Sequence, residues 1–354
     1  MWLLDNQTSF AAERGFLQDR HGALIWIVAI KGTFVLGPDG EFKAADDPLP
    51  VELAPKYRGE PGASSLLSEA DFTLPKPTAD ILLEGSAHAP LAKAAARVDV
   101  RLSVGEINKS LRVFGDRTWK EGIFGPTMTA PEPFVTMPIV YERAYGGTES
   151  KEKAADPLKR AAERRNPVGI GFCSKQEDAI GRNLPNVEDP TDLISSWKSR
   201  PRPAGFGAIA RDWSPRFELA GTYGQAWRDQ RCPLLPDDFQ ERFHQTAPVD
   251  QQAPKPLLGG ERVELENLTP DGGMQSFRLP RFKFAIRTEF QGGEAIDQGS
   301  GVSIQTLTLE PGKKRLILVW QASLLCPPSR HKKLLRTTVK VLPSQGAERV
   351  ADAR

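Results

Sequence analysis

The chain of 354 residues is long enough to bury a substantial hydrophobic core, in one large β-rich domain or in two domains. Its 47 lysines and arginines nearly balance its 45 aspartates and glutamates, which excludes a strong overall field toward nucleic acid or an anionic membrane surface. The 31 glycines and 30 prolines predict many turns and exclude an architecture of long helices.

The N-terminal stretch MWLLDNQTSF reaches Asp5 before the core of a signal peptide is complete. Elsewhere no apolar run approaches the ~18 residues that a membrane-spanning helix needs. We therefore expect a cytoplasmic protein that has neither a membrane nor a nucleic acid as its partner.

Residues 1–125 are rich in strand patterns. The run ALIWIVAIKGTFVL, residues 23–36, is β-branched and aromatic and ends at the turn GPDG, which predicts a buried strand. Shorter strands are expected in ADILLEGSA, RVDVRLSVG and KSLRVFGDRTW, and in the second of these apolar residues alternate with polar ones. We expect these strands to pair in antiparallel fashion.

Residues 126–258 are dominated by loop-forming residues, with tryptophans spread between prolines. One short helix is expected over residues 157–165, because Asp156 can cap it and the pair Asn166–Pro167 ends it. Another is expected in DDFQERFHQTA, where Phe239 and Phe243 fall four apart. So long a loop region with this aromatic content is typical of an ordered, protein-binding layer.

Residues 259–341 return to strand patterns. RVELENL and MQSFRLPRFKFAIRTEF predict strands, and EPGKK predicts the turn of a hairpin that joins VSIQTLTL to RLILVWQASLL. TTVKVL predicts one more edge strand, and residues 342–354 are expected to form a flexible tail. The predicted fold class is mainly β, with packed antiparallel sheets (sandwich or barrel-like) and a loop-rich middle that carries short helices. A single domain is expected over residues 1–341.

The motifs of cofactor and metal sites are incomplete. NPVGIGFCSK holds two glycines one residue apart, but it lacks the third glycine of a GxGxxG phosphate loop, so tight turns are the simpler interpretation. The cysteines Cys173, Cys232 and Cys326 lie far apart, and the histidines show no HxH or HExxH spacing. We therefore predict no cofactor, no metal site and no disulfide framework.

A hydrolase is the alternative function that the residues leave open. It would use carboxylates such as Glu188 and Asp189 of NVEDP, or Cys173 with His244, since the chain has no GxSxG elbow. Carboxylates in loops more often cap helices and turns, and a cysteine is more often buried than reactive. We therefore predict no catalytic residue.

A series of segments, in a fixed order, carries a resemblance to a known family. The series is YERAYGG, NPVGIGF, LPNVEDP, PAGFGAI, AGTYGQAW, CPLLPDDFQERFHQTAPVDQQ, LLGGERVELENLTPDG and LILVWQASL, preceded by ADILLEGSA and VFGDRTW. It resembles the bacterial family catalogued as domain of unknown function 2169, from about residue 10 to about residue 325. Gly224 stands where the family pattern has Asp, and the C-terminal stretch RHKKLLRTTVKV lies beyond the resemblance.

The resemblance implies an accessory protein of the type VI secretion system. Such proteins are regarded as adaptors or chaperones that hold a toxic effector and help to load it onto the spike, which is a valine-glycine repeat protein (VgrG) or its PAAR tip. The family is not regarded as catalytic and offers no established site residues. A structural component that is secreted with the spike is a third possible class.

Candidate partner-binding or loop-network residues follow from motif position and chemistry. These polar and aromatic side chains are expected to form either a polar network beneath the loops or a recognition surface above them. They are Arg143, Tyr145, Asn166, Arg182, Asn186, Glu188, Asp189, Trp213, Tyr223 and Trp227.

Overall fold

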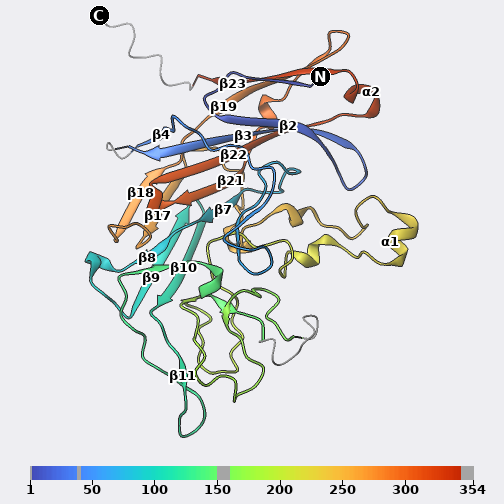
Figure 1. The fold of residues 1–354 in the computed structure, drawn as a ribbon. Coiled ribbons are helices and arrows are strands. Elements are labelled where there is room, and N and C mark those ends of the chain that lie inside the picture. Colours follow the sequence, from blue (N-terminus) through green and yellow to red (C-terminus); the bar gives the residue numbers. More distant parts are fainter. Residues whose placement is uncertain (1, 38–40, 150–159, 344–354) are drawn as a thin grey trace, which may run out of the picture.

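The computed structural model describes residues 2–37, 41–149 and 160–343. Three sheets carry most of the strands, and the loop-rich middle of the chain, green to yellow in Figure 1, lies below and beside them. The predicted fold class is confirmed: the protein is mainly β, with several packed antiparallel sheets and few short helices.

A six-stranded sheet forms the centre of the fold. Its order is β2-β3-β22-β21-β7, and β4 pairs with β3. The predicted strand over the β-branched run is its long second member, which is buried from Trp26 to Phe34, and the predicted hairpin joins β21 to β22. The strands are β2 (Ala11–Gln18), β3 (Leu24–Leu36), β4 (Phe42–Ala44), β7 (Asp80–Leu83), β21 (Ser303–Glu310) and β22 (Arg315–Leu325).

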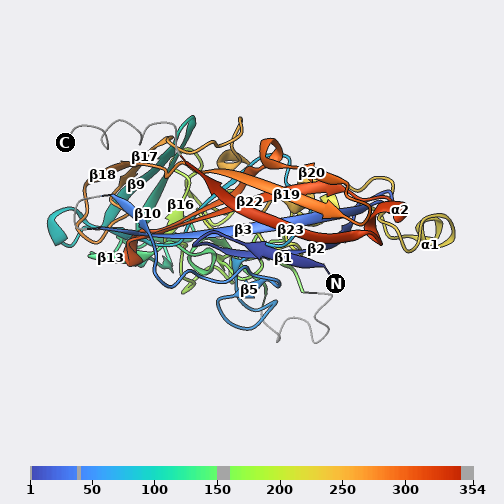
Figure 2. The same cartoon turned by 90° about the horizontal axis from the view of Figure 1, so that it is seen from above.

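A four-stranded sheet of order β1-β23-β19-β20 packs against this centre. Figures 1 and 2 show β19 and β23 stacked over β3 and β22. Aromatic side chains of the two layers contact each other. Phe284 of β19 meets Trp320 of β22 with ring centroids 5.2 Å apart, and Phe10 stacks on Trp320 at 5.7 Å. The strands are β1 (Leu3–Asn6), β19 (Lys283–Phe290), β20 (Ala295–Asp297) and β23 (Leu334–Leu342).

A five-stranded sheet of order β16-β10-β9-β17-β18 carries the rest of the core. The alternation predicted for RVDVRLSVG is confirmed, because Val98, Val100, Leu102 and Val104 are buried on one face of β9. The strands are β9 (Arg97–Val104), β10 (Ile107–Phe114), β16 (Val187–Glu188), β17 (Arg262–Glu266) and β18 (Met274–Arg278).

Four two-stranded pairs complete the strands of the described residues. They are β5 (Lys56–Tyr57) with β6 (Leu66–Ser68), β8 (Ser86–His88) with β13 (Thr136–Pro138), β11 (Trp119–Lys120) with β12 (Thr127–Met128), and β14 (Tyr145–Gly146) with β15 (Ile170–Gly171).

Two details of the strand prediction are wrong. Antiparallel pairing was expected throughout the first 125 residues, but β1 pairs with β23 and β7 with β21 in parallel. TTVKVL was expected at an edge, whereas β23 lies between β1 and β19, because β1 returns to cover it. This strand also extends to Leu342, where the tail was expected to begin, and residues 344–354 lie outside the described residues.

The helices are short, and among the described residues none has the length and apolarity needed to cross a membrane. The predicted helix over residues 157–165 is wrong for its described part, residues 160–165. These residues form a β-bridge from Ala162 to Thr148 and then a turn. The backbone there completes the loop layer instead of a helix, and residues 150–159 lie outside the described part. The predicted helix in DDFQERFHQTA is one 3-10 turn, η5.

All helices of the described residues, η5 included, are between three and six residues long. They are α1 (Gln225–Gln230), α2 (Pro328–His331), η1 (Pro90–Ala92), η2 (Tyr141–Arg143), η4 (Phe217–Ala220), η5 (Glu241–His244), η6 (Val249–Gln251), η7 (Gly299–Gly301) and η8 (Pro311–Lys313).

Candidate functional site

The segments YERAYGG and NPVGIGF lie back to back in the loop layer. Their backbones pair in parallel as β14 and β15, and Asn166 is fully buried between them, with Nδ2 donating to the carbonyls of Tyr141 at 2.7 Å and Tyr145 at 3.1 Å. A Cβ on Gly169 would lie 2.6 Å from the carbonyl oxygen of Ala144. The glycines of this motif therefore allow two backbones to approach each other closely.

A second group of contacts joins this layer to the five-stranded sheet. Arg143 Nη1 donates to Asn186 Oδ1 at 2.9 Å, and Asn186 Nδ2 donates to Asp116 Oδ1 at 2.8 Å and to the carbonyl of Phe114 at 3.2 Å. Arg143 also lies 3.5 Å from the carboxylate of Asp116. The amide of Asn186 thus bridges η2 and the end of β10.

Glu188 is 2% exposed at the end of β16. One of its oxygens forms an ion pair with Arg117, and the other accepts from the backbone N–H of Ile194 at 2.8 Å. Arg117 donates as well to the carbonyl of Pro185 at 2.7 Å and stacks over the ring of Phe114 at 3.9 Å. A buried charge that is paired and hydrogen-bonded in this way fixes the loops around it.

Asp189 lies next to Glu188 but in a more open setting. Burial raises its pKa, but hydrogen bonds from the backbone and hydroxyl of Thr191 and the nearby Arg202 outweigh burial, and the pKa falls below its usual value. The carboxylate accepts from Thr191 Oγ1 at 2.7 Å and lies 3.3 Å from Arg202. Arg182, by contrast, donates to the carbonyl of Phe172 at 2.8 Å inside the loop layer.

A satellite apolar cluster lies beneath the same loops, and Cys173 is fully buried in it. The cluster consists of Trp119, Tyr145, Cys173, Ala179, Leu184 and Ile194. Burial raises the pKa of Tyr145 to about 12, so its hydroxyl stays protonated. His244, which the sequence pairs with Cys173 in the hydrolase alternative, lies instead against Phe239 and Phe243.

The three remaining aromatic candidates, after Tyr145, occupy two different places. Trp213 is 2% exposed and packs edge-on against Tyr141, with ring centroids 5.5 Å apart. Tyr223 is 49% exposed and meets Trp227 of α1 at 4.8 Å, while Trp227 Nε1 donates to the carbonyl of Leu234 at 2.7 Å. Figure 1 shows the α1 segment projecting from the side of the molecule, away from the sheets.

A groove of about 320 Å³ opens where the family-like segments converge. Its floor and walls are mainly apolar, and its rim carries charges of both signs, from Arg165, Asp189, Arg202 and Asp250. Most of the lining residues come from YERAYGG, PAGFGAI, LPNVEDP and APVDQQ, and from β10. The apolar and tyrosine members are Leu111, Tyr141, Pro203, Ala204, Ile209, Pro215, Pro248 and Val249.

Lys109 of β10 also lines this groove, and its side chain is 10% exposed. Its Nζ donates to Asp250 Oδ1 at 2.9 Å and to Gln251 Oε1 at 2.8 Å, and burial lowers its pKa although Asp250 opposes that effect. The ion pair holds η6 against the sheet, which leaves Val249 61% exposed at the rim. A groove of this size, apolar inside and polar at its rim, has the composition of a site for an apolar side chain of a ligand or partner.

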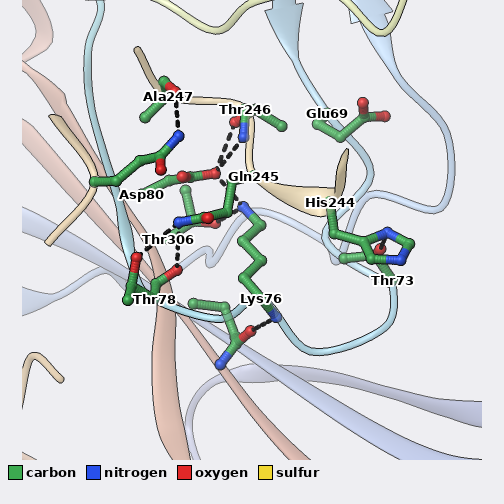
Figure 3. A network of polar contacts seen from close by, with 12 residues as sticks. Glu69, Thr73, Lys76, Thr78, Asp80, His244, Gln245, Thr246, Ala247 and Thr306 are labelled. Carbon is green, nitrogen blue, oxygen red and sulfur yellow. Dashed lines mark hydrogen bonds and ion pairs between the residues drawn. The ribbon is translucent and has the colours of Figure 1, made fainter. Parts of the chain in front are cut away.

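The sequence alone did not identify a buried polar network around Lys76 and Asp80. Lys76 Nζ and Asp80 Oδ2 form an ion pair at 2.7 Å, and the same oxygen accepts from the backbone N–H of Thr246 at 2.7 Å and from its hydroxyl at 3.0 Å. Lys76 also donates to Thr306 Oγ1 at 2.7 Å. Figure 3 shows these residues converging from three distant segments. The sequence held one indication of this network: Asp80, a charged residue, stands directly before the apolar run ILL, and a buried charge needs a partner.

His244 lies beside this network with its Nε2 buried and without a hydrogen-bond partner in the described residues. Burial, followed by the charges of Arg216 and Lys76, lowers its pKa to about 4, against the opposing charge of Glu69. The imidazole is therefore neutral near pH 7. Since the ordinary pKa of 6.5 applies to the unfolded chain, acid protonates the unfolded state first.

Acidification from pH 7 to pH 5 is accordingly expected to cost about 2 kcal/mol of unfolding free energy through His244 alone. This contribution is fully present above pH 6.5 and is lost as the pH falls toward 4. Urea unfolding at both pH values measures it, in the parent and in His244→Gln, whose pH dependence should be smaller by that amount. The exposed His21→Gln is the matched control. Equal pH dependence in His244→Gln and the parent would contradict the assignment.

The described residues contain no group of three or more His, Cys, Asp or Glu side chains arranged to hold a metal ion. No match was found among curated proteins or among solved structures. A family model described as an uncharacterized protein conserved in bacteria (DUF2169) matches residues 21–321, a span that includes most of the central sheet, the loop layer and the groove. The chain therefore belongs to the bacterial DUF2169 family.

Proposed function

We propose that this protein is a cytoplasmic accessory adaptor of a type VI secretion system. In this proposal it binds a cognate effector, shields apolar surface of that effector, and helps to load it onto the VgrG or PAAR spike. The groove formed by the family-like segments is the observation that carries the proposal, because distant parts of the chain converge there on an apolar site with a charged rim.

The chemistry of the groove supports a protein partner. Its volume of about 320 Å³ suits one or two apolar side chains of an extended segment, and the rim offers Arg202, Asp189 and Asp250 to polar groups on either side. Asp80 of the buried network accepts from the N–H of Thr246, and the carbonyl of Thr246 accepts from Ile209 of the groove wall at 2.8 Å. The Lys109–Asp250 ion pair joins two further lining residues, from β10 and η6. A rigid site of this kind needs no nucleotide to bind and later release a partner.

The test is co-purification of the tagged protein from its native host, with mass spectrometry of the proteins that remain bound. We expect an effector encoded nearby or a spike component. Val249→Glu, which places a charge on the exposed rim of the groove, should lower its recovery at least about tenfold, since the charge must be desolvated when the partner binds.

Leu53→Glu is the matched control, because Leu53 is 67% exposed and lies outside the groove. Both variants should keep the unfolding free energy of the parent to within ~0.5 kcal/mol. Unchanged recovery with Val249→Glu would remove the groove from the proposal. Recovery of no reproducible partner by an abundant, folded protein would overturn the adaptor function and favour the hydrolase alternative.

A further inference from the structure

Two large apolar side chains at the tip of the β11–β12 hairpin are exposed to solvent. Ile123 is 95% exposed and Phe124 is 102% exposed, so neither is covered by the rest of the protein. Isolated exposed leucines are normal on protein surfaces. An adjacent Ile–Phe pair that is fully exposed is less usual, because neither side chain gains the favourable free energy of burial. Figure 1 shows the hairpin, near the label β11, extending from the lower end of the molecule.

The tip is held in a defined shape. At the base of the hairpin Trp119 is 4% exposed in the satellite cluster, and its carbonyl accepts from Gly181 at 2.7 Å. At the turn, the N–H of Gly125 donates to the carbonyl of Gly122 at 3.1 Å, and Gly125 has a φ of +115°. A Cβ on Gly122 would lie 2.7 Å from the carbonyl oxygen of Gly125. The glycines therefore fix a tight turn that presents both apolar side chains.

A concave notch of about 650 Å³ lies beside the tip. The side chains of Glu121, Glu177 and Ile180 line it, and Ile180 is 43% exposed. Glu177 makes an exposed ion pair with Lys175 at 3.8 Å, and no ion pair of Glu121 occurs among the described residues. The surface thus combines a projecting apolar pair with an acidic, partly apolar recess.

These charges distinguish between the possible occupants. An anionic lipid surface requires an excess of basic side chains next to the inserting residues. Here the exposed lysines near the tip, Lys120 and Lys175, are matched by the carboxylates Glu121 and Glu177 that line the recess, so no such excess exists among these residues. A protein surface with an apolar pocket and a lysine or arginine at its edge matches both features. The fixed turn lowers the entropy cost of such an insertion, since the apolar pair does not have to be ordered on binding.

We infer that Ile123 and Phe124 anchor this protein to a partner protein, by insertion into an apolar pocket bordered by a basic side chain that pairs with Glu121. The inference rests on the proposed adaptor function and assigns that function a second contact surface, separate from the groove. Hot-spot residues of this type carry much of the binding free energy of an interface, because they are buried most completely.

Site-specific photocrosslinking in the native host tests the anchor. The tagged full chain carries p-benzoyl-phenylalanine in place of Phe124 or, as the control, in place of the exposed Leu258, and irradiation is followed by mass spectrometry of the adducts. We expect one protein to be crosslinked from position 124 and not from position 258. The adduct should map to an apolar pocket of that protein that has a lysine or arginine at its edge.

The same protein should then respond to substitutions of the tip. Ile123→Ser with Phe124→Ser should weaken its binding about 100-fold in a titration of the purified pair, and Glu121→Lys about tenfold. Leu258→Ser and Lys255→Glu, on other exposed positions, should leave binding unchanged. Because both tip side chains are fully exposed, the double variant should unfold at the same urea concentration as the parent.

The outcomes separate this inference from the proposed function. Binding of an effector or spike protein that the tip substitutions leave unchanged would overturn the anchor and keep the adaptor. A tip-dependent partner unrelated to secretion would keep the anchor and overturn the adaptor. Phe124-dependent flotation with vesicles of phosphatidylethanolamine and phosphatidylglycerol, or an absence of any adduct from position 124, would overturn the anchor.

Discussion

Replacing Asp80 by alanine is expected to destabilise the protein by about 3–5 kcal/mol, the typical cost of removing one partner from a buried ion pair. Asp80 is fully buried, and its Oδ2 accepts from Lys76 Nζ and from both the backbone and the hydroxyl of Thr246. In Asp80→Ala the ammonium group of Lys76, whose side chain is 4% exposed, retains Thr306 Oγ1 as its one hydrogen-bond partner among the described residues. Urea unfolding at pH 7 measures the loss.

Glu106→Ala is the matched control, since it breaks an ion pair of equal length, 2.7 Å to Lys255, between side chains that are 59% and 76% exposed. That change should cost less than ~1 kcal/mol. Removing both buried charges, in Lys76→Met with Asp80→Leu, should recover much of the loss because no unpaired charge remains. If Asp80→Ala and Glu106→Ala lost equal amounts, the buried pair would not stabilise the fold.

Local sequence patterns were sufficient to predict the long strands of the three large sheets except β2, whereas most of the strands of two to four residues were not predicted. The β-branched run around Trp26 and the alternation from Val98 to Val104 predict which side chains are buried, and the same side chains are buried in the structure. Which strands pair with each other could not be predicted from these local patterns. Strand β7 meets β21 in parallel across more than two hundred residues, and nothing in either segment specifies that partner.

Some features of the candidate site could also be predicted from local sequence, and others could not. The polar residues near the glycine motifs are brought together in the loop layer, because their partners are backbone and side-chain groups of neighbouring motifs. Residue type alone could not separate Trp213, which is buried, from Tyr223, which is exposed. The network of Lys76 and Asp80 escaped prediction because its other members come from β21 and from the segment after η5.

The tip residues were missed for a different reason. In the sequence, Ile123 and Phe124 stand between two glycines in a region of short strands, where an apolar pair normally turns inward. Their exposure follows from the hairpin, which extends beyond the satellite cluster that holds Trp119. An outward apolar pair can therefore be recognised only once the supporting elements are placed.

The second large effect is expected from Gly146→Ala, in the loop layer. A Cβ at this position would lie 2.1 Å from the carbonyl oxygen of Asn166, a backbone atom that cannot move without breaking the hydrogen bond from Gly147 N–H at 2.8 Å. Gly146 also has a φ of +156°. We expect a loss of about 3 kcal/mol or more, with the damage concentrated where β14 pairs with β15.

Gly312→Ala is the control for this variant, because nothing lies within 4 Å of its added Cβ, and it should change the stability by less than ~0.5 kcal/mol. Hydrogen exchange distinguishes a local from a global effect. In Gly146→Ala the amides of Ile170 and Phe172, which donate to Ala144 and Gly146, should lose protection before those of β3 do. Since Tyr141 lines the groove and lies in the same layer, this variant should also lose the partner in co-purification. Parent-like exchange of those two amides would show that the close approach of the two backbones is not required, and the glycines of the motif would then need another explanation.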